Sequence, residues 1–244
     1  MRIKVINPNT TWSMTEKIGE AARRAASPGV EILAVSPRMG PVSIEGSYDE
    51  AFAAVGVIDE VLRGEAEGCD GYVIACFGDP GLAAAREVAR GPVVGIAEAA
   101  MHAASLIGTG FSIVSMLERS RMTMEHLVHA YGMERRCRSI RMTDIPVLDL
   151  EIEGSDAQAR IIAECRCAIS EDHADCVLLG CGGMSDLMAR VSAEIGAPAI
   201  DGVSAGVRLV EALAGLGLGT SKRQGYAAPL AKVYEGEFGR FAPR

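Results

Sequence analysis

Two cysteines stand at equivalent places in two similar stretches of the chain. The segment DGYVIACFGDP, residues 70–80, aligns with DCVLLGCGGMS, residues 175–185, so that Cys76 matches Cys181 at an offset of 105 residues. A single cysteine at the end of a strand usually packs as a small hydrophobic residue. Packing gives no reason for both copies to keep a thiol at the same turn. We therefore expect Cys76 and Cys181 to carry out chemistry.

Glycines follow each cysteine before the next expected helix, which puts both thiols at the carboxyl end of a buried strand. In open parallel sheets the ligand crevice lies beyond these strand ends. If an approximate two-fold axis relates the two copies, the thiols point into one crevice from opposite sides. One sulfur, as thiolate, can then remove a proton from carbon while the other, as thiol, returns a proton to the opposite face. The pair predicts a two-base racemisation or epimerisation of a small molecule, without a cofactor.

The residues around the two thiols predict how they are activated. We expect a helix N-terminus behind each sulfur to lower its pKa below the usual value. Gly78, Gly182 and Gly183 have no side chains to cover their turns, so their backbone N–H groups are exposed and can donate hydrogen bonds to an oxyanion. Asp79 is expected to cap the helix that begins near Gly81. Glu45 could orient either a loop or a ligand.

The elements that must position these residues alternate along the chain. Expected strands are residues 3–6, 30–35, 72–75, 93–94, 111–114, 138–141, 176–179 and 199–200, and expected helices include 14–26, 49–65, 81–89, 119–131, 156–171 and 185–194. Strands that alternate with helices indicate parallel sheets. With the internal repeat, this predicts an α/β fold of two pseudo-symmetric Rossmann-like parallel-sheet halves, with the active site in the cleft between them. The alternative is one sheet shared by both halves.

We divide the chain into an N-terminal α/β half, residues 1–105, which carries Cys76, and a C-terminal α/β half, residues 106–218, which carries Cys181. Residues 219–244 form a C-terminal tail that we expect to pack back on the body. We also expect a homo-oligomer, since symmetric association is the commonest arrangement of soluble proteins.

Composition excludes several classes of partner. The net charge of −8 argues against nucleic acid, because phosphate binding needs a basic face. No apolar run reaches the roughly 18 residues that span a membrane, and the opening MRIKVINPN lacks a secretory pattern. Seven cysteines without a Cys-x-x-Cys pair favour a reducing compartment over a disulfide framework, and no zinc site is expected. We therefore expect a cytoplasmic protein. The five cysteines outside the repeated pair are assigned to packing: Cys69, Cys137, Cys165, Cys167 and Cys176.

Four motifs carry a resemblance to a known family. They are INPNT at residues 6–10, SIEG at 43–46, ACFGDPGL at 75–82 and LGCGGM at 179–184. Together, and in this order, they resemble the hydantoin and allantoin racemases of the aspartate/glutamate racemase superfamily over nearly the whole chain. The triplet that begins at Cys181, the segment GIAEAAMHAA at 95–104 and the tail after Lys222 resemble allantoin racemases most closely.

The resemblance implies two pseudo-symmetric α/β domains, no cofactor, and proton transfer by Cys76 and Cys181. It also implies that six further residues line the substrate: Asn9, Ser43, Phe77, Gly78, Gly182 and Gly183. Which thiol serves which enantiomer stays open.

One departure from the wider superfamily bears on the substrate. Amino-acid racemases usually carry Cys-Asn-Thr after each catalytic cysteine, whereas this chain has Cys-Phe-Gly at residue 76 and Cys-Gly-Gly at residue 181. Without those polar side chains, a neutral cyclic imide fits better than an amino acid. The sequence therefore predicts an allantoin racemase that acts at C5 of the hydantoin ring. Alternatives are a racemase of 5-alkyl or 5-aryl hydantoins, a maleate-isomerase-like or decarboxylase activity, and a non-catalytic binding protein of small molecules.

Overall fold

The computed structural model describes residues 1–152 and 155–243, and within them eight β-strands alternate with eight α-helices. The strands are β1 (Arg2–Ile6), β2 (Glu31–Val35), β3 (Gly71–Ile74), β4 (Val93–Gly95), β5 (Phe111–Ser115), β6 (Cys137–Met142), β7 (Cys176–Leu179) and β8 (Ala199–Asp201). The helices are α1 (Trp12–Ala25), α2 (Ser47–Glu67), α3 (Leu82–Val88), α4 (Ile96–Ile107), α5 (Arg121–Ala130), α6 (Ala157–Ser170), α7 (Met188–Ile195) and α8 (Gly202–Gly215).

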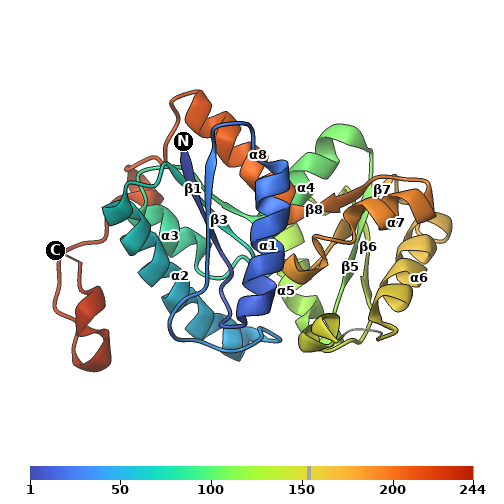
Figure 1. The fold of residues 1–244 in the computed structure, drawn as a ribbon, viewed down its shortest axis with the longest axis horizontal. Coiled ribbons are helices and arrows are strands. Elements are labelled where there is room, and N and C mark those ends of the chain that lie inside the picture. Colours follow the sequence, from blue (N-terminus) through green and yellow to red (C-terminus); the bar gives the residue numbers. More distant parts are fainter. Residues whose placement is uncertain (153–154, 244) are drawn as a thin grey trace.

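The strands form two separate four-stranded sheets, both wholly parallel. The first has the order β2-β1-β3-β4 and the second the order β6-β5-β7-β8, so each sheet repeats the connectivity of the other. The two sheets occupy opposite sides of the molecule (Figure 1). The central strands β3 and β7 are apolar and buried along their whole length, as parallel strands covered on both faces must be. The structure confirms the two-sheet α/β fold and excludes one shared sheet.

The last helix of each half packs on the sheet of the other half. Helix α4 follows β4 of the first sheet but packs against β7 and β8 of the second, and α8 follows β8 but packs against β3 and β4. Helices α4 and α8 also contact each other, and α1 packs beside α8, so a helical layer separates the two sheets (Figure 1). One of the two apolar clusters of the described residues consequently includes residues of both sheets, for example Val73 and Leu178.

The N-termini of α4 and α8 are both capped by aspartates. Asp201 directly precedes α8 and accepts hydrogen bonds from the N–H groups of Val203 (3.0 Å) and Ser204 (2.9 Å). Asp79 accepts from the N–H groups of Ala97 (3.1 Å) and Glu98 (3.0 Å), which belong to α4. The expectation that Asp79 caps the helix after Gly81 is therefore wrong.

The reason lies in the backbone between Asp79 and α3. Gly81 has a φ of 74°, in the left-handed region, and turns the chain so that α3 begins without a side-chain cap. The Asp79 carboxyl instead reaches the start of α4, where Gly95 leaves room for it. A Cβ at Gly95 would lie 2.2 Å from the Asp79 Cγ.

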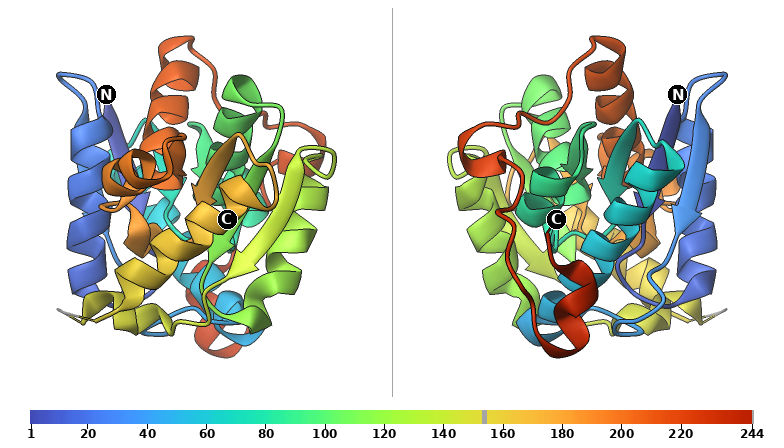
Figure 2. Two further views of the ribbon diagram at one scale, coloured as in Figure 1. Left: turned by 90° about the vertical axis from the view of Figure 1, so that its right-hand side faces the viewer. Right: turned by 90° about the vertical axis from the view of Figure 1, so that its left-hand side faces the viewer.

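The segment after α8 runs back over the first half, as the right-hand view of Figure 2 shows. Thr220 donates its backbone N–H to the carbonyl of Arg90 (3.0 Å), and Lys222 Nζ donates to the carbonyl of Arg86 (2.6 Å). Near the C-terminus, Arg240 lies 3.7 Å from the carboxylate of Asp59 on α2. No helix in the described part of the chain is long and apolar enough to cross a membrane.

Candidate active site

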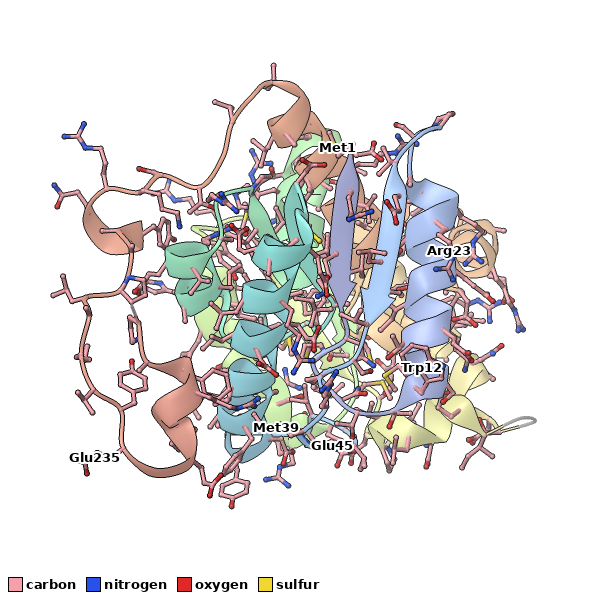
Figure 3. The ribbon with its side chains drawn as sticks, turned by 60° about the vertical axis from the view of Figure 1, so that its left-hand side comes forward. Met1, Trp12, Arg23, Met39, Glu45 and Glu235 are labelled. Carbon is pink, nitrogen blue, oxygen red and sulfur yellow. The ribbon has the colours of Figure 1, made fainter. Side chains whose placement is uncertain are left out.

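A cavity lies where the carboxyl ends of the central strands of both sheets meet. Its walls come from the turns after β1 and β3 of the first sheet and after β5 and β7 of the second. The loop that ends at Gly46 closes it on one side, and Figure 3 places Glu45 of this loop at the end of the molecule opposite Met1. The cavity volume of about 50 Å³ is room for about four water molecules.

Both repeated cysteines line this cavity, one from each half. Their turns are in close contact, because a Cβ at Gly182 would lie only 2.6 Å from the carbonyl oxygen of Ala75. Ala75 directly precedes Cys76, and Gly182 directly follows Cys181. A side chain at residue 182 would push the two turns apart, so glycine is required for the thiols to share one small space.

Burial dominates the acidity of the two thiols. It raises the pKa of Cys181 to about 11, although the backbone N–H of Gly183 donates to this sulfur and opposes the shift. Burial also raises the pKa of Cys76, against a hydrogen bond from the N–H of Gly78. The expectation that a helix N-terminus lowers both pKa values is therefore wrong. The turn after Cys76 leads into the left-handed Gly81 rather than straight into a helix, and desolvation outweighs the N–H groups at both sulfurs.

Four of the six expected substrate-lining residues are brought together at the cavity: Asn9, Phe77, Gly78 and Gly182. Phe77 is buried and forms part of the wall beside Cys76. Ser43 is partly exposed and lies outside the cavity lining. Gly183 is also outside the lining, but its N–H contacts the Cys181 sulfur from behind.

Asn9 is held in one orientation by its neighbours. Its side-chain oxygen accepts from Asn7 Nδ2 (2.9 Å) and from the backbone N–H of Thr11 (2.9 Å). Its Nδ2 donates to the sulfur of Met14 at 3.2 Å. Since an amide nitrogen carries two hydrogens, a second N–H remains to serve a ligand in the cavity.

Sequence reasoning missed several other residues of the cavity walls, among them Ser115 of the second half and Glu50 of α2. Ser115 ends β5, and its hydroxyl donates to the carbonyl of Gly180 (2.9 Å), which fixes the turn before Cys181. Glu50, in the first turn of α2, lies beside Gly78 and had no motif to mark it. The position of Ser115 could have been found from the repeat, because β5 matches β1 and the residues after β1 belong to the INPNT motif.

The cavity is acidic and apolar. Its apolar walls are formed by Met14, Ile44, Phe77, Met116, Met124 and Val147, among others. Two carboxylates, Glu45 and Glu50, also line it, and Glu45 Oε1 accepts from the N–H of Val147 at 3.2 Å. Among the described residues, no Lys, Arg or His lines the cavity, and no group of three His, Cys, Asp or Glu residues could hold a metal ion. The site consequently suits a neutral ligand better than an anion.

Comparisons with known proteins agree on one family. The sequence profile described as Asp/Glu/hydantoin racemase matches residues 3–210. A hydantoin racemase from Pseudomonas sp. (strain NS671) is 48% identical over 241 residues, which cover 99% of this chain and 97% of that protein. The solved allantoin racemase from Klebsiella pneumoniae has a TM-score of 0.97 at 52% identity and covers all of both chains. The allantoin racemase from Pseudomonas fluorescens has a TM-score of 0.93 at 39% identity, over 97% of this chain and all of that one.

Proposed function

The chain belongs to the Asp/Glu/hydantoin racemase family and is a racemase, and from this premise we propose that it interconverts (R)- and (S)-allantoin without a cofactor. The proposed catalytic residues are Cys76 and Cys181. The observation that carries the proposal is the contact between their two turns, which aims thiols from opposite sheets into one cavity.

Each turnover moves one proton off C5 of the hydantoin ring and another proton onto it. One sulfur, as thiolate, takes the C5 proton, and the C–H electron pair moves into the neighbouring ring carbonyl to form an enolate. The opposite thiol then delivers its proton to the other face of C5, and the carbonyl re-forms. At the end the two sulfurs have exchanged protonation states, so the reverse reaction starts from the product enantiomer.

The surroundings of the sulfurs suggest that one set of hydrogen-bond donors serves the thiolates and another serves the enolate oxygen. The N–H groups of Gly78 and Gly183 are directed at the two sulfurs, where they favour the thiolate. The enolate oxygen therefore needs another donor, and we assign this role to the second N–H of Asn9 Nδ2, because Asn9 lines the cavity and its first N–H donates to Met14. Such preorganised donors are typically the largest single contribution to stabilising an oxyanion.

The charge of the cavity supports a neutral substrate such as allantoin. Among the described residues, its lining carries two carboxylates and no cationic side chain, which disfavours free amino acids and dicarboxylates because like charges repel.

A second candidate is a racemase of 5-alkyl or 5-aryl hydantoins. The name of the Pseudomonas sp. relative and the apolar walls of the cavity favour it. Initial racemisation rates of allantoin, 5-methylhydantoin and 5-benzylhydantoin, corrected for the uncatalysed reaction, separate the two candidates. Our proposal requires the highest kcat/KM for allantoin, and a preference for the benzyl compound would replace it with the second candidate.

The catalytic assignment is tested by single substitutions followed by circular dichroism of each allantoin enantiomer. Cys76→Ser and Cys181→Ser should each reduce racemisation to the uncatalysed rate, because each face of C5 then lacks its acid–base group. Cys176→Ser removes a thiol from the amino end of the same strand, β7, and should retain racemisation. Full racemisation by the Cys181→Ser protein would refute the assignment.

A further inference from the structure

The carboxylate of Glu50 is enclosed in the cavity wall next to Cys76. Its Oε1 lies 2.6 Å from the point that a Cβ at Gly78 would occupy, so glycine at residue 78 leaves room for it. Burial raises the pKa of Glu50, and a hydrogen bond from Thr123 opposes this shift only in part. No Lys, Arg or His in the described part of the chain forms an ion pair with it. Glu50 is only partly exposed, and a partly desolvated carboxylate without a cation is stabilised when a ligand supplies further donors.

The two neighbouring acidic residues accept hydrogen bonds from backbone N–H groups of the loop and of the second half, whereas the protein donor to Glu50 is the side chain of Thr123. Glu45 Oε1 accepts from the N–H of Val147 and so ties the loop before α2 to the second half. Asp49 Oδ2 accepts from the N–H of Glu45 at 3.0 Å and shapes the same loop. Neither residue needs a ligand to explain its position. Glu50 alone of the three is placed against the catalytic turn itself.

We propose that Glu50 is the residue that selects allantoin, by accepting the two N–H groups of its ureido substituent while C5 lies between Cys76 and Cys181. This inference rests on the proposed function, since it names the group that distinguishes allantoin from other 5-substituted hydantoins.

The chemistry of the two partners favours this pairing over one with the ring. A ureido group carries two N–H bonds that point in the same direction, away from its carbonyl, and a planar carboxylate accepts two parallel N–H bonds. The two N–H bonds of the hydantoin ring diverge, so the ring can offer only one of them to a carboxylate. A 5-alkyl substituent offers none and would cover the partly exposed Glu50 without adding a donor to the one from Thr123.

Glu50 also links substrate binding to the reacting sulfur. Its negative charge is one of the groups that raise the pKa of Cys76. When the ureido N–H groups donate to Glu50, they partly neutralise its negative charge. The carboxylate then raises the pKa of the Cys76 thiol less. A substrate with a ureido group thereby both fills the polar end of the cavity and eases proton loss from Cys76.

The test compares two substrates in three proteins. Wild type, Glu50→Gln and Asp49→Asn are assayed for racemisation of allantoin and of 5-methylhydantoin, and kcat/KM is measured for each. Gln keeps the shape of the side chain but replaces one acceptor oxygen with a donor. Asp49→Asn makes the same change in charge one residue away, outside the cavity lining.

Glu50→Gln should lower kcat/KM for allantoin about 10- to 100-fold, the loss expected for hydrogen bonds to a charged group, while 5-methylhydantoin keeps its value or gains. Asp49→Asn should leave the ratio of the two substrates as in wild type. Equal losses for both substrates in Glu50→Gln, or no loss for allantoin, would overturn the inference. A wild-type protein that fails to racemise allantoin would instead refute the proposed function. The substrate ratio within one protein also separates specificity from misfolding, which lowers both rates alike.

Discussion

The two sulfurs differ in their electrostatic surroundings although the internal repeat places them at matching turns. After burial, the pKa of Cys76 is raised further by the nearby charges of Cys181, Glu50 and Asp79. The pKa of Cys181 is raised, besides burial, by Glu151. The Glu151 carboxylate forms an ion pair with Lys17 at 2.8 Å. The positive charge of Lys17 partly offsets the effect of Glu151 on the pKa of the Cys181 thiol. We therefore expect Cys181 to lose its proton before Cys76.

Alkylation kinetics test this order. Because a thiol with a raised pKa is protonated at neutral pH, the thiolate fraction of Cys181 should rise about tenfold per pH unit between pH 7 and 10, below its pKa of about 11. Peptide mapping by mass spectrometry after brief iodoacetamide treatment should show Cys181 modified before Cys76, and allantoin should protect both. Cys167, a partly exposed cysteine outside the cavity, provides a reference in each sample. Faster modification of Cys76 would reverse the order.

At the same scale, the sequence singles out the two thiols but not Glu50. The repeat marks Cys76 and Cys181 because packing does not explain a thiol at both turns, and both residues line the cavity. Their catalytic role stays a prediction. Glu50 lies on α2 and is distant in the sequence from Gly78. The contact between the two residues depends on how this helix packs against the first sheet. No local pattern encodes that contact. The raised thiol pKa values were missed for the same reason, since burial is a property of the assembled site.

At the scale of elements, Asp79 connects three segments that are distant in the sequence: the turn after β3, the start of α4 and the residue after α5. It caps α4 and accepts from the hydroxyl of Tyr131, which follows α5 in the second half, at 2.7 Å. The Asp79–Tyr131 hydrogen bond therefore connects the two halves directly. Burial raises the pKa of Asp79 to about 6, whereas these donors lower it.

Tyr131→Phe isolates the connection between the halves. We expect the free energy of unfolding, from urea titration, to fall by about 1 to 2 kcal/mol at pH 8. The loss should be smaller at pH 4.5, because Asp79 is then protonated in the folded state and accepts more weakly. Tyr48→Phe, at a tyrosine that is 76% exposed, should change stability by less than about 0.5 kcal/mol. Equal losses for Tyr131→Phe at both pH values would show that the Asp79 charge plays no part.

The contribution of Asp79 to the free energy of unfolding depends on pH in the wild-type protein as well. Its pKa is about 6 in the folded state, above the roughly 3.9 of an unfolded aspartate. The folded state therefore binds more protons between these values, and the stability contributed by Asp79 is lost as the pH rises through 6.

Element boundaries show what local sequence can and cannot predict. The strand predictions agree with the structure because runs of β-branched residues between turn signals are a local property. The helix expected at 185–194 begins only at Met188, since the chain first makes a short 3-10 turn at Gly182–Met184 that carries the Cys181 site. The partner of Asp79 was missed because the capped residue Ala97 lies 18 residues away and belongs to a different helix.

At the scale of the whole molecule, the exchanged helices bind the two halves into one folding unit. Helix α8 covers the face of the first sheet at β3 and β4, and α4 does the same for β7 and β8. Val203 and Val207 of α8 are completely buried in the shared core. The sequence does not specify which sheet each of these two helices covers, because either packing buries the same apolar face. The proposed division at residue 105 thus separates the chain without separating the core.

Fragments test this interdependence. A fragment of residues 1–105 should fail to unfold cooperatively and should bind a hydrophobic dye, since the face that α8 covers is left open. The same fragment with residues 200–218 attached through a flexible Gly/Ser linker should recover a cooperative urea transition. Cooperative unfolding of residues 1–105 alone would contradict the shared core.

The most direct test of the two-thiol account is the isotope content of C5 during racemisation in deuterated water. One enantiomer of allantoin is incubated with the enzyme to low conversion, and both enantiomers are then separated and analysed by mass spectrometry, with an enzyme-free sample for the background. Because one sulfur removes the proton and the other sulfur supplies a new one, the inverted enantiomer should carry deuterium while the recovered starting enantiomer keeps its hydrogen. Deuterium appearing equally in both enantiomers, or an inverted product that retains hydrogen, would contradict proton transfer by Cys76 and Cys181.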